Sequence, residues 1–203
     1  MSRFETTYSQ WRAFLVASDG WGNERWWLDS RWDGRARMQM IEEDEVDDYP
    51  VTWVNWYDAT AYCAWLTERL RQAGELPAGY VVRLPSSEEW QFAALGTDGR
   101  RFPWGDSYVA GYARTDQIGS VGLSPQDVSP YGVFDMFGNV QEWTQSTSGI
   151  AFSARKQMEV SAAIIRGGDL REGSDNVPVV GGRTMAKPNM NREGFRVVMA
   201  DQQ

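Results

Sequence analysis

The chain has 203 residues, 42% of them hydrophobic, a net charge of −8, 11 tryptophans, one cysteine and no histidine. This length and apolar content suit one domain, so we take residues 1–203 as a single unit. The acidic balance argues against a nucleic-acid partner, because phosphate binding needs a basic surface. A single cysteine cannot form an internal disulfide, and no apolar run approaches the ~20 residues that span a bilayer. Since no signal peptide is visible, we expect a cytoplasmic location by default.

Helix signals are confined to the first half of the chain. Thr6 or Thr7 can cap a helix whose apolar residues recur at helical spacing. The same spacing recurs from about residue 58 to 73, and Gly74 supplies a stop. Residues 86–89, Ser-Ser-Glu-Glu, form a capping box that starts a third helix.

After residue 96 the chain is punctuated by glycine and proline, and its apolar residues come in short runs. Residues 162–166 and 195–199 are predicted to form short strands, whereas 144–158 lacks a clear period and is predicted to be an exposed loop. The chain is therefore expected to be an α+β domain. Its helices lie in the N-terminal half, and short antiparallel strands with long loops fill the C-terminal half.

Three motifs are the most specific features of the sequence. The run YGVFDMFGNVQEW ends at Glu142-Trp143, and it is followed by Arg166-Gly-Gly and Gly194-Phe-Arg. Together with matching helix segments in the right order, these motifs resemble the formylglycine-generating enzyme (sulfatase-modifying factor) family. The resemblance covers nearly the whole chain and implies a C-type-lectin-like fold. That family usually has a strand before its opening helix, so the first strand here is expected to be shortened, or the chain to be part of a larger multidomain protein.

The loop from Asp135 to Glu142 is a candidate metal site. Asp135 and Glu142 offer carboxylate oxygens, and Gly138 allows a sharp turn that can point its own carbonyl and that of Val140 inward. Hard cations such as calcium prefer such oxygens, and the resemblance implies calcium at these four positions. The alternative is a structural turn in which Asn139 bonds to backbone and Glu142 pairs with an arginine.

A second calcium site of that family requires asparagine between residues 112 and 128. Only Asp116 and Asp127 are present there, so this second site is not expected.

The family's oxidase chemistry lacks its ligands in this chain. The resembled copper enzyme uses two cysteines between the Arg-Gly-Gly and Gly-Phe-Arg motifs, and residues 169–193 contain none. A related iron-dependent branch uses histidines, which are absent throughout. Soft Cu(I) needs thiolates, so neither copper nor iron is expected and the chain is predicted not to be an enzyme. The lone Cys63 falls inside the second predicted helix, where an inert core residue is expected.

Residues 166–196 form a candidate ligand-binding or variable segment, bracketed by two of the motifs. The segment resembles the region that variable proteins of diversity-generating retroelements randomise on this scaffold. The resemblance implies an exposed binding face made of Asp169, Arg171, Glu172, Asp175, Asn176, Val179, Thr184, Met185, Asn189 and Asn191. Adaptable side chains on a rigid frame would suit recognition. The alternative is a plain loop that covers the core.

Three functions therefore remain open. The first is a non-catalytic module that binds a protein or other macromolecular ligand through residues 169–193. The second is an oxidoreductase of the formylglycine-generating type that uses unrecognised residues. The third is a sensor domain of a larger effector. In each case Arg166, Arg183 and Arg196 are expected to be frame residues paired with buried acids such as Glu142 or Glu89.

Overall fold

The computed structural model describes residues 1–27, 46–152, 158–167, 184–186 and 193–202. Its α-helices are α1 (Tyr8–Val16), α2 (Trp56–Ala73) and α3 (Ser87–Leu95), with a short 3₁₀ helix η1 (Glu24–Trp26) after α1. All three α-helices begin with a complete capping box, at Thr7, Asn55 and Ser86. Each box satisfies backbone amides that a helix start leaves without partners, which explains why these helices begin where they do.

The strands form two small sheets. In the first, β1 (Tyr80–Arg83) pairs antiparallel with β6 (Val198–Asp201). The second has four strands, in the spatial order β4 (Thr184–Ala186), β3 (Met158–Arg166), β2 (Glu142–Phe152) and β5 (Gly194–Phe195). β2 and β3 are antiparallel, whereas β5 runs parallel to the start of β2. The structure is therefore the expected mixture of early helices and late strands.

Two sequence-based predictions about strands are wrong. Residues 144–158 are not one exposed loop, because 144–152 belong to β2 and Met158 begins β3. The predicted strand at 195–199 is two strands, β5 and β6, which join different sheets. Ser and Thr dominate the start of β2, so the local sequence lacks the apolar alternation of a typical strand. Pairing with β3 determines the structure instead.

Aromatic side chains fill the core in two clusters. The larger one joins α1, α2 and β5, and its centre contains Trp11, Phe14, Tyr62 and Phe195 in edge-on or tilted ring contacts. The smaller one packs α3 against the irregular chain that follows it, around Trp90. The indole N–H groups of four buried tryptophans donate to carbonyl or carboxylate oxygens, which offsets the cost of burying them: Trp26, Trp56, Trp90 and Trp143.

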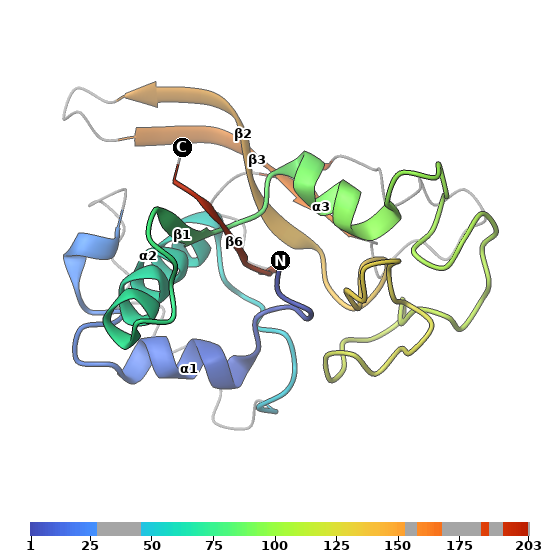
Figure 1. The fold of residues 1–203 in the computed structure, drawn as a ribbon, viewed down its shortest axis with the longest axis horizontal. Helices are drawn as coiled ribbons and strands as arrows, with labels where there is room; N and C mark the ends of the chain where they lie inside the picture. The colour runs from blue at the N-terminus through green and yellow to red at the C-terminus, as the bar shows by residue number, and fades with distance from the viewer. Residues whose placement is uncertain (28–45, 153–157, 168–183, 187–192, 203) are drawn as a thin grey trace.

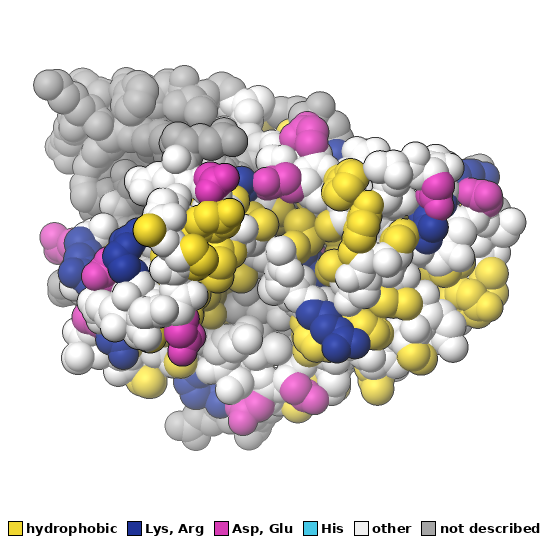
Figure 2. All heavy atoms as spheres, in the orientation of Figure 1, with side chains coloured by type: hydrophobic (Ala, Val, Ile, Leu, Met, Phe, Trp, Pro, Cys, Tyr) yellow, Lys and Arg dark blue, Asp and Glu magenta, His cyan; other side chains and the backbone are white. Residues whose placement is uncertain are grey.

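The two clusters correspond to two halves of the molecule. Helices α1 and α2 lie at one side, the irregular residues 96–141 lie at the other, and β2 and β3 run from between them toward the α2 side (Figure 1). The first residues run beside the last ones, since the Ser2 and Thr6 amides donate to the carbonyls of Val197 and Phe195. Acidic and basic side chains are scattered over the face in Figure 2 and do not segregate by sign there. In the part of the chain that the structure describes, no helix is long and apolar enough to cross a membrane.

Candidate functional site

Both ends of the candidate binding segment are anchored on either side of Glu142, the first residue of β2. Arg166, the last residue of β3, pairs with Glu142 across the antiparallel ladder, and Gly194, the first residue of β5, pairs with it across the parallel one. Neighbouring strands lie about 4.8 Å apart, so the two ends are separated by roughly 10 Å. The chain therefore ends β3 at residue 166 and enters β5, on the other side of β2, at residue 194, while β4 in between pairs with β3.

The Glu142 side chain is the centre of a buried ion pair. Arg196 donates to its carboxylate twice, from Nε to Oε2 at 2.7 Å and from Nη2 to Oε1 at 2.6 Å, and Trp90 Nε1 donates to Oε2 at 2.8 Å. Both charged side chains are fully buried. Burial opposes the charge on Arg196, yet the neighbouring Glu142 carboxylate raises the pKa of the guanidinium above its ordinary value. One motif residue, Arg196, is thereby tied to another, Glu142, by the geometry that arginine favours for carboxylates.

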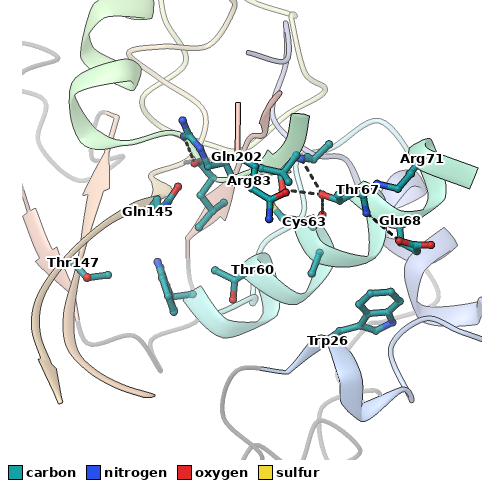
Figure 3. A pocket seen from close by; sticks show the side chains of 15 residues that line it. Trp26, Thr60, Cys63, Thr67, Glu68, Arg71, Arg83, Gln145, Thr147 and Gln202 are labelled. Carbon is teal, nitrogen blue, oxygen red and sulfur yellow. Dashed lines mark hydrogen bonds and ion pairs between the residues drawn. The ribbon is translucent and has the colours of Figure 1, made fainter. Parts of the chain in front are cut away.

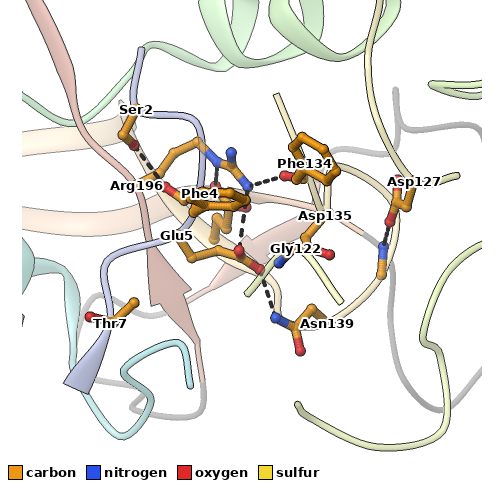
Figure 4. A network of polar contacts seen from close by, with 12 residues as sticks. Ser2, Phe4, Glu5, Thr7, Gly122, Asp127, Phe134, Asp135, Asn139 and Arg196 are labelled. Carbon is orange, nitrogen blue, oxygen red and sulfur yellow. Dashed lines mark hydrogen bonds and ion pairs between the residues drawn. The ribbon is translucent and has the colours of Figure 1, made fainter. Parts of the chain in front are cut away.

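Two further acids, Glu5 and Asp135, lie near this pair (Figure 4). Glu5 lies with its Oε2 4.0 Å from Arg196 Nη2, and its Oε1 accepts a hydrogen bond from Asn139 Nδ2 at 3.1 Å. Burial raises the pKa of Glu5 well above its ordinary value, with further increases from the charges of Asp135 and Glu142, although Arg196 opposes the shift. One arginine thus faces three carboxyl groups, and burial raises the pKa of both Glu5 and Asp135.

The loop from Asp135 to Asn139 is held tightly by the preceding chain. Asp127 accepts from the amides of Phe137 and Gly138, and Asn139 Oδ1 accepts from the Gly119 amide at 3.0 Å. Asp135 and Asn139 both adopt left-handed backbone conformations, with φ of 56° and 64°. A side chain at Gly138 would collide with the backbone of Arg114, so only glycine fits there.

The four residues predicted to bind calcium lie between Asp135 and Glu142, and the carboxylates of both acids already accept hydrogen bonds. Both Glu142 oxygens accept from Arg196, and Asp135 Oδ2 accepts from the Gly122 amide at 2.5 Å. Within the described residues, no group of three Asp, Glu, His or Cys side chains is arranged to hold a metal ion. The structure contains the pairing that the alternative describes, a glutamate on an arginine, and this conformation does not fit calcium. Calcium at Asp135, Gly138, Val140 and Glu142 stays a prediction.

Of the ten residues predicted to form the binding face, only Thr184 and Met185 belong to the described backbone. They lie on β4, the edge strand of the sheet, where Thr184 pairs with Ile165 and Met185 with Ile164. The other eight, Asp169, Arg171, Glu172, Asp175, Asn176, Val179, Asn189 and Asn191, lie outside the described residues.

The predicted frame arginines are placed as follows. Arg196 pairs with Glu142, as expected, whereas Glu89 pairs with Arg83 through two hydrogen bonds of 2.6 and 2.8 Å. Arg166 donates to Ser87 Oγ and to Gln91, so it links β3 to α3. Arg183 lies outside the described residues.

Sequence reasoning missed two residues near this frame. Asp127 was considered only as a metal ligand, but it supports the loop by accepting two backbone amides. Trp53 is 52% exposed and has a left-handed backbone, with φ of 60°. It lies two residues after Val51, whose backbone is close to Gly194. A β-carbon added to Gly194 would lie 2.9 Å from the Val51 carbonyl oxygen. Nothing in the sequence distinguishes Trp53 from its buried neighbours, because exposure here depends on the path of the chain before α2.

The only thiol is far from being a nucleophile. Cys63 is buried in the larger aromatic cluster, and burial raises the pKa of its thiol far above the ordinary value. The chain has no histidine that could activate it. The expectation of an inert core cysteine therefore agrees with its environment.

Comparisons with known proteins identify the family. The model of the sulfatase-modifying factor enzyme 1-like domain matches residues 1–201. The chain belongs to this family. The inactive Cα-formylglycine-generating enzyme 2 of Mus musculus is 37% identical over 115 residues, which cover 49% of this chain and 33% of that protein. Hercynine oxygenase of Mycolicibacterium thermoresistibile is 32% identical over 174 residues, which cover 72% of this chain and 35% of that protein.

A solved structure shares the fold. Treponema denticola variable protein 1 superposes with a TM-score of 0.65 over 98% of this chain and 82% of that one, at 21% identity. This member of the sulfatase-modifying factor family therefore has the expected C-type-lectin-like fold. Its chain spans about a third of the length of the curated relatives that it matches.

Proposed function

We propose that this domain is a non-catalytic binding module, which recognises a protein or other macromolecular ligand through residues 169–193. The observation that carries the proposal is chemical. The chain has no histidine, and its one cysteine is buried in α2 outside the 166–196 segment. The chain thus has the fold of the family without the thiolates and imidazoles that copper or iron chemistry would need.

The geometry of the frame supports a binding role. The segment begins and ends beside Glu142, and the ends are held by buried polar contacts of Arg166 and Arg196. The 27 residues between Arg166 and Gly194 join ends about 10 Å apart, and a connection of this length can change in sequence while β2, β3 and β5 keep their pairing. Recognition loops elsewhere likewise vary in sequence on a rigid support.

Two relatives favour the same function. One matched relative is named an inactive enzyme, and a solved variable protein shares the fold. We extend this to the present chain as a member that presents side chains and does not react. Retroelement-driven diversification of residues 169–193 is part of the proposal, and so is a place within a larger multidomain protein.

Trp53 is a further candidate for the binding face. It is half-exposed and follows Val51, whose carbonyl oxygen lies against Gly194, by two residues. Tryptophan is over-represented among residues that dominate interface energies. A strained, exposed tryptophan at this place in the chain is therefore a suitable fixed anchor for a ligand.

The second candidate is an oxidoreductase, favoured by the match to a hercynine oxygenase over 72% of this chain. One assay separates the two. The purified protein is titrated with Cu(I) and, separately, with Fe(II), and oxygen consumption is followed with a cysteine-containing peptide as substrate. We expect no stoichiometric metal binding and no turnover above free metal. Turnover that requires the protein would contradict the proposal and support the oxidoreductase.

A further inference from the structure

A cavity of about 590 Å³ lies between α2, β1 and the middle of β2 (Figure 3). Its lining residues do not include Glu142, Arg196 or the described ends of the 166–196 segment. Every residue used in the argument below therefore lies outside residues 169–193. Its volume falls within the range of about 300–1,000 Å³ that is usual for small-molecule sites.

The cavity lies where small side chains of α2 adjoin β1 and β2. Thr60, Ala64 and Thr67 follow one another at helical spacing along the lining. On the opposite wall, Gln145 and Thr147 are two residues apart on β2 and share one face of the strand. None of these side chains is long enough to fill the space between a helix and a strand.

The apolar part of the wall is aromatic. Trp26 and Trp56 both line the cavity, and both indole N–H groups are already bonded, to the carbonyls of Asp19 and Thr144 at 2.6 and 2.9 Å. These two side chains can therefore offer ring surface without needing a polar partner from a ligand. Val82 and Leu84 of the adjoining chain extend this apolar surface.

Each of the three charged side chains in the wall has an ion-pair partner. Arg71 pairs with Glu68 at 3.2 Å, and Arg83 pairs with Glu89 outside the cavity at 2.6 Å. A charged ligand would have to compete with these pairs. The Thr67 hydroxyl is also engaged, with the Cys63 carbonyl and with Val82.

We propose that this cavity binds a small uncharged molecule with an apolar, ring-containing body. The ring packs against Trp26 and Trp56, and one polar group of the ligand faces the amide and hydroxyl groups of Gln145, Thr147 and Gln202. The inference does not depend on the binding role of residues 169–193, since none of the residues it names belongs to that segment.

The test uses N-phenyl-1-naphthylamine, an uncharged aromatic fluorophore, with the full chain. We expect saturable binding with one site per chain. Ala64 lines the cavity and is exposed, so Ala64→Trp should fill the space and weaken binding at least tenfold without unfolding α2. The matched control is Ala13→Trp, at an exposed position of α1 away from the cavity, which should bind as the wild type does.

A second measurement needs no variant. In the wild-type protein, the indole N–H resonances of Trp26 and Trp56 should shift as the fluorophore is added, and that of Trp143, which is not in the lining, should stay. Lack of saturable binding overturns the proposal. It is overturned equally by unchanged affinity in a folded Ala64→Trp variant, or by shifts that spare both lining tryptophans. None of these results bears on residues 169–193.

Discussion

Arg196 holds Glu142 through two hydrogen bonds, with both side chains fully buried. Glu142 also pairs with Arg166 on one side and with Gly194 on the other in the sheet. This one contact therefore holds in place the strand that lies between the two residues flanking the 169–193 segment. A buried pair of this kind adds little net stability compared with apolar residues, but it is costly to break on one side. The pair therefore fixes the position of the segment ends more than it strengthens the fold.

We predict that Glu142→Gln lowers the free energy of unfolding by about 3–5 kcal/mol, because it leaves the Arg196 charge buried without its partner. Urea unfolding measures the change. The matched control is Glu89→Gln, which weakens the partly exposed pair with Arg83 and should cost about 1 kcal/mol or less. Equal losses in the two variants would show that the buried pair has no special role.

The stability of the protein should fall as the pH rises from about 5 to 8. Burial raises the pKa of Asp127 to about 7, and it also raises the pKa of Glu5. A raised folded-state pKa gives stability that is complete below the unfolded pKa of about 4 and is lost as the pH rises through the folded pKa. The chain has no histidine, so no imidazole titrates in this range.

Urea unfolding at several pH values tests this dependence. Asp127→Asn should reduce the slope between pH 5 and 8, because an amide replaces a carboxyl that is otherwise protonated when folded. Each pKa unit corresponds to about 1.4 kcal/mol. Stability that rises over this range, or a slope that Asp127→Asn leaves unchanged, would contradict the buried, protonated state of these acids.

Calcium binding at Asp135, Gly138, Val140 and Glu142 can be tested by titration of EDTA-treated protein. An ion there would have to displace Arg196 from Glu142, so we expect binding no tighter than about 10⁻⁴ M. A Glu142→Gln variant should abolish any such binding. A dissociation constant in the nanomolar range would mean that the loop adopts a different arrangement when the ion is bound.

Trp53→Gly should hold or raise the free energy of unfolding, by up to about 1 kcal/mol, because glycine tolerates the left-handed backbone that strains a tryptophan. Trp53→Ala, which keeps the strain, is the control and should bring no such gain. Thermal unfolding compares the two. A large loss in both variants would show that Trp53 packs into the core and is not held out for a ligand.

Local signals in the sequence predicted the helices well. Each capping box depends on residues three apart in the chain, so Thr7 and Ser86 could be recognised directly. The sheets depend on distant partners instead: Tyr80 pairs with Asp201, and Glu142 with both Arg166 and Gly194. No window of sequence contains such pairs, which is why β1 was not predicted and β2 was taken for a loop.

Some contacts of the candidate site could also be predicted from the sequence, and others could not. An arginine partner for Glu142 was foreseen as the alternative to calcium, since a buried acid needs a counter-charge. That Glu5 joins the network could not be foreseen, because 134 residues separate it from its partner Asn139. The exposure of Trp53 had no local signal either, as its neighbours Thr52 and Val54 are buried.

The central proposal is that residues 169–193 recognise ligands while the rest of the domain keeps its structure. The decisive measurement is a display library in which the ten predicted positions are randomised and the rest of the chain is kept, selected against hen egg-white lysozyme. We predict folded binders whose melting temperature is near that of the parent protein. These binders should no longer bind lysozyme when their ten positions are changed back to the parent residues. Libraries that fail to fold, or binders that tolerate this restoration, would contradict the account.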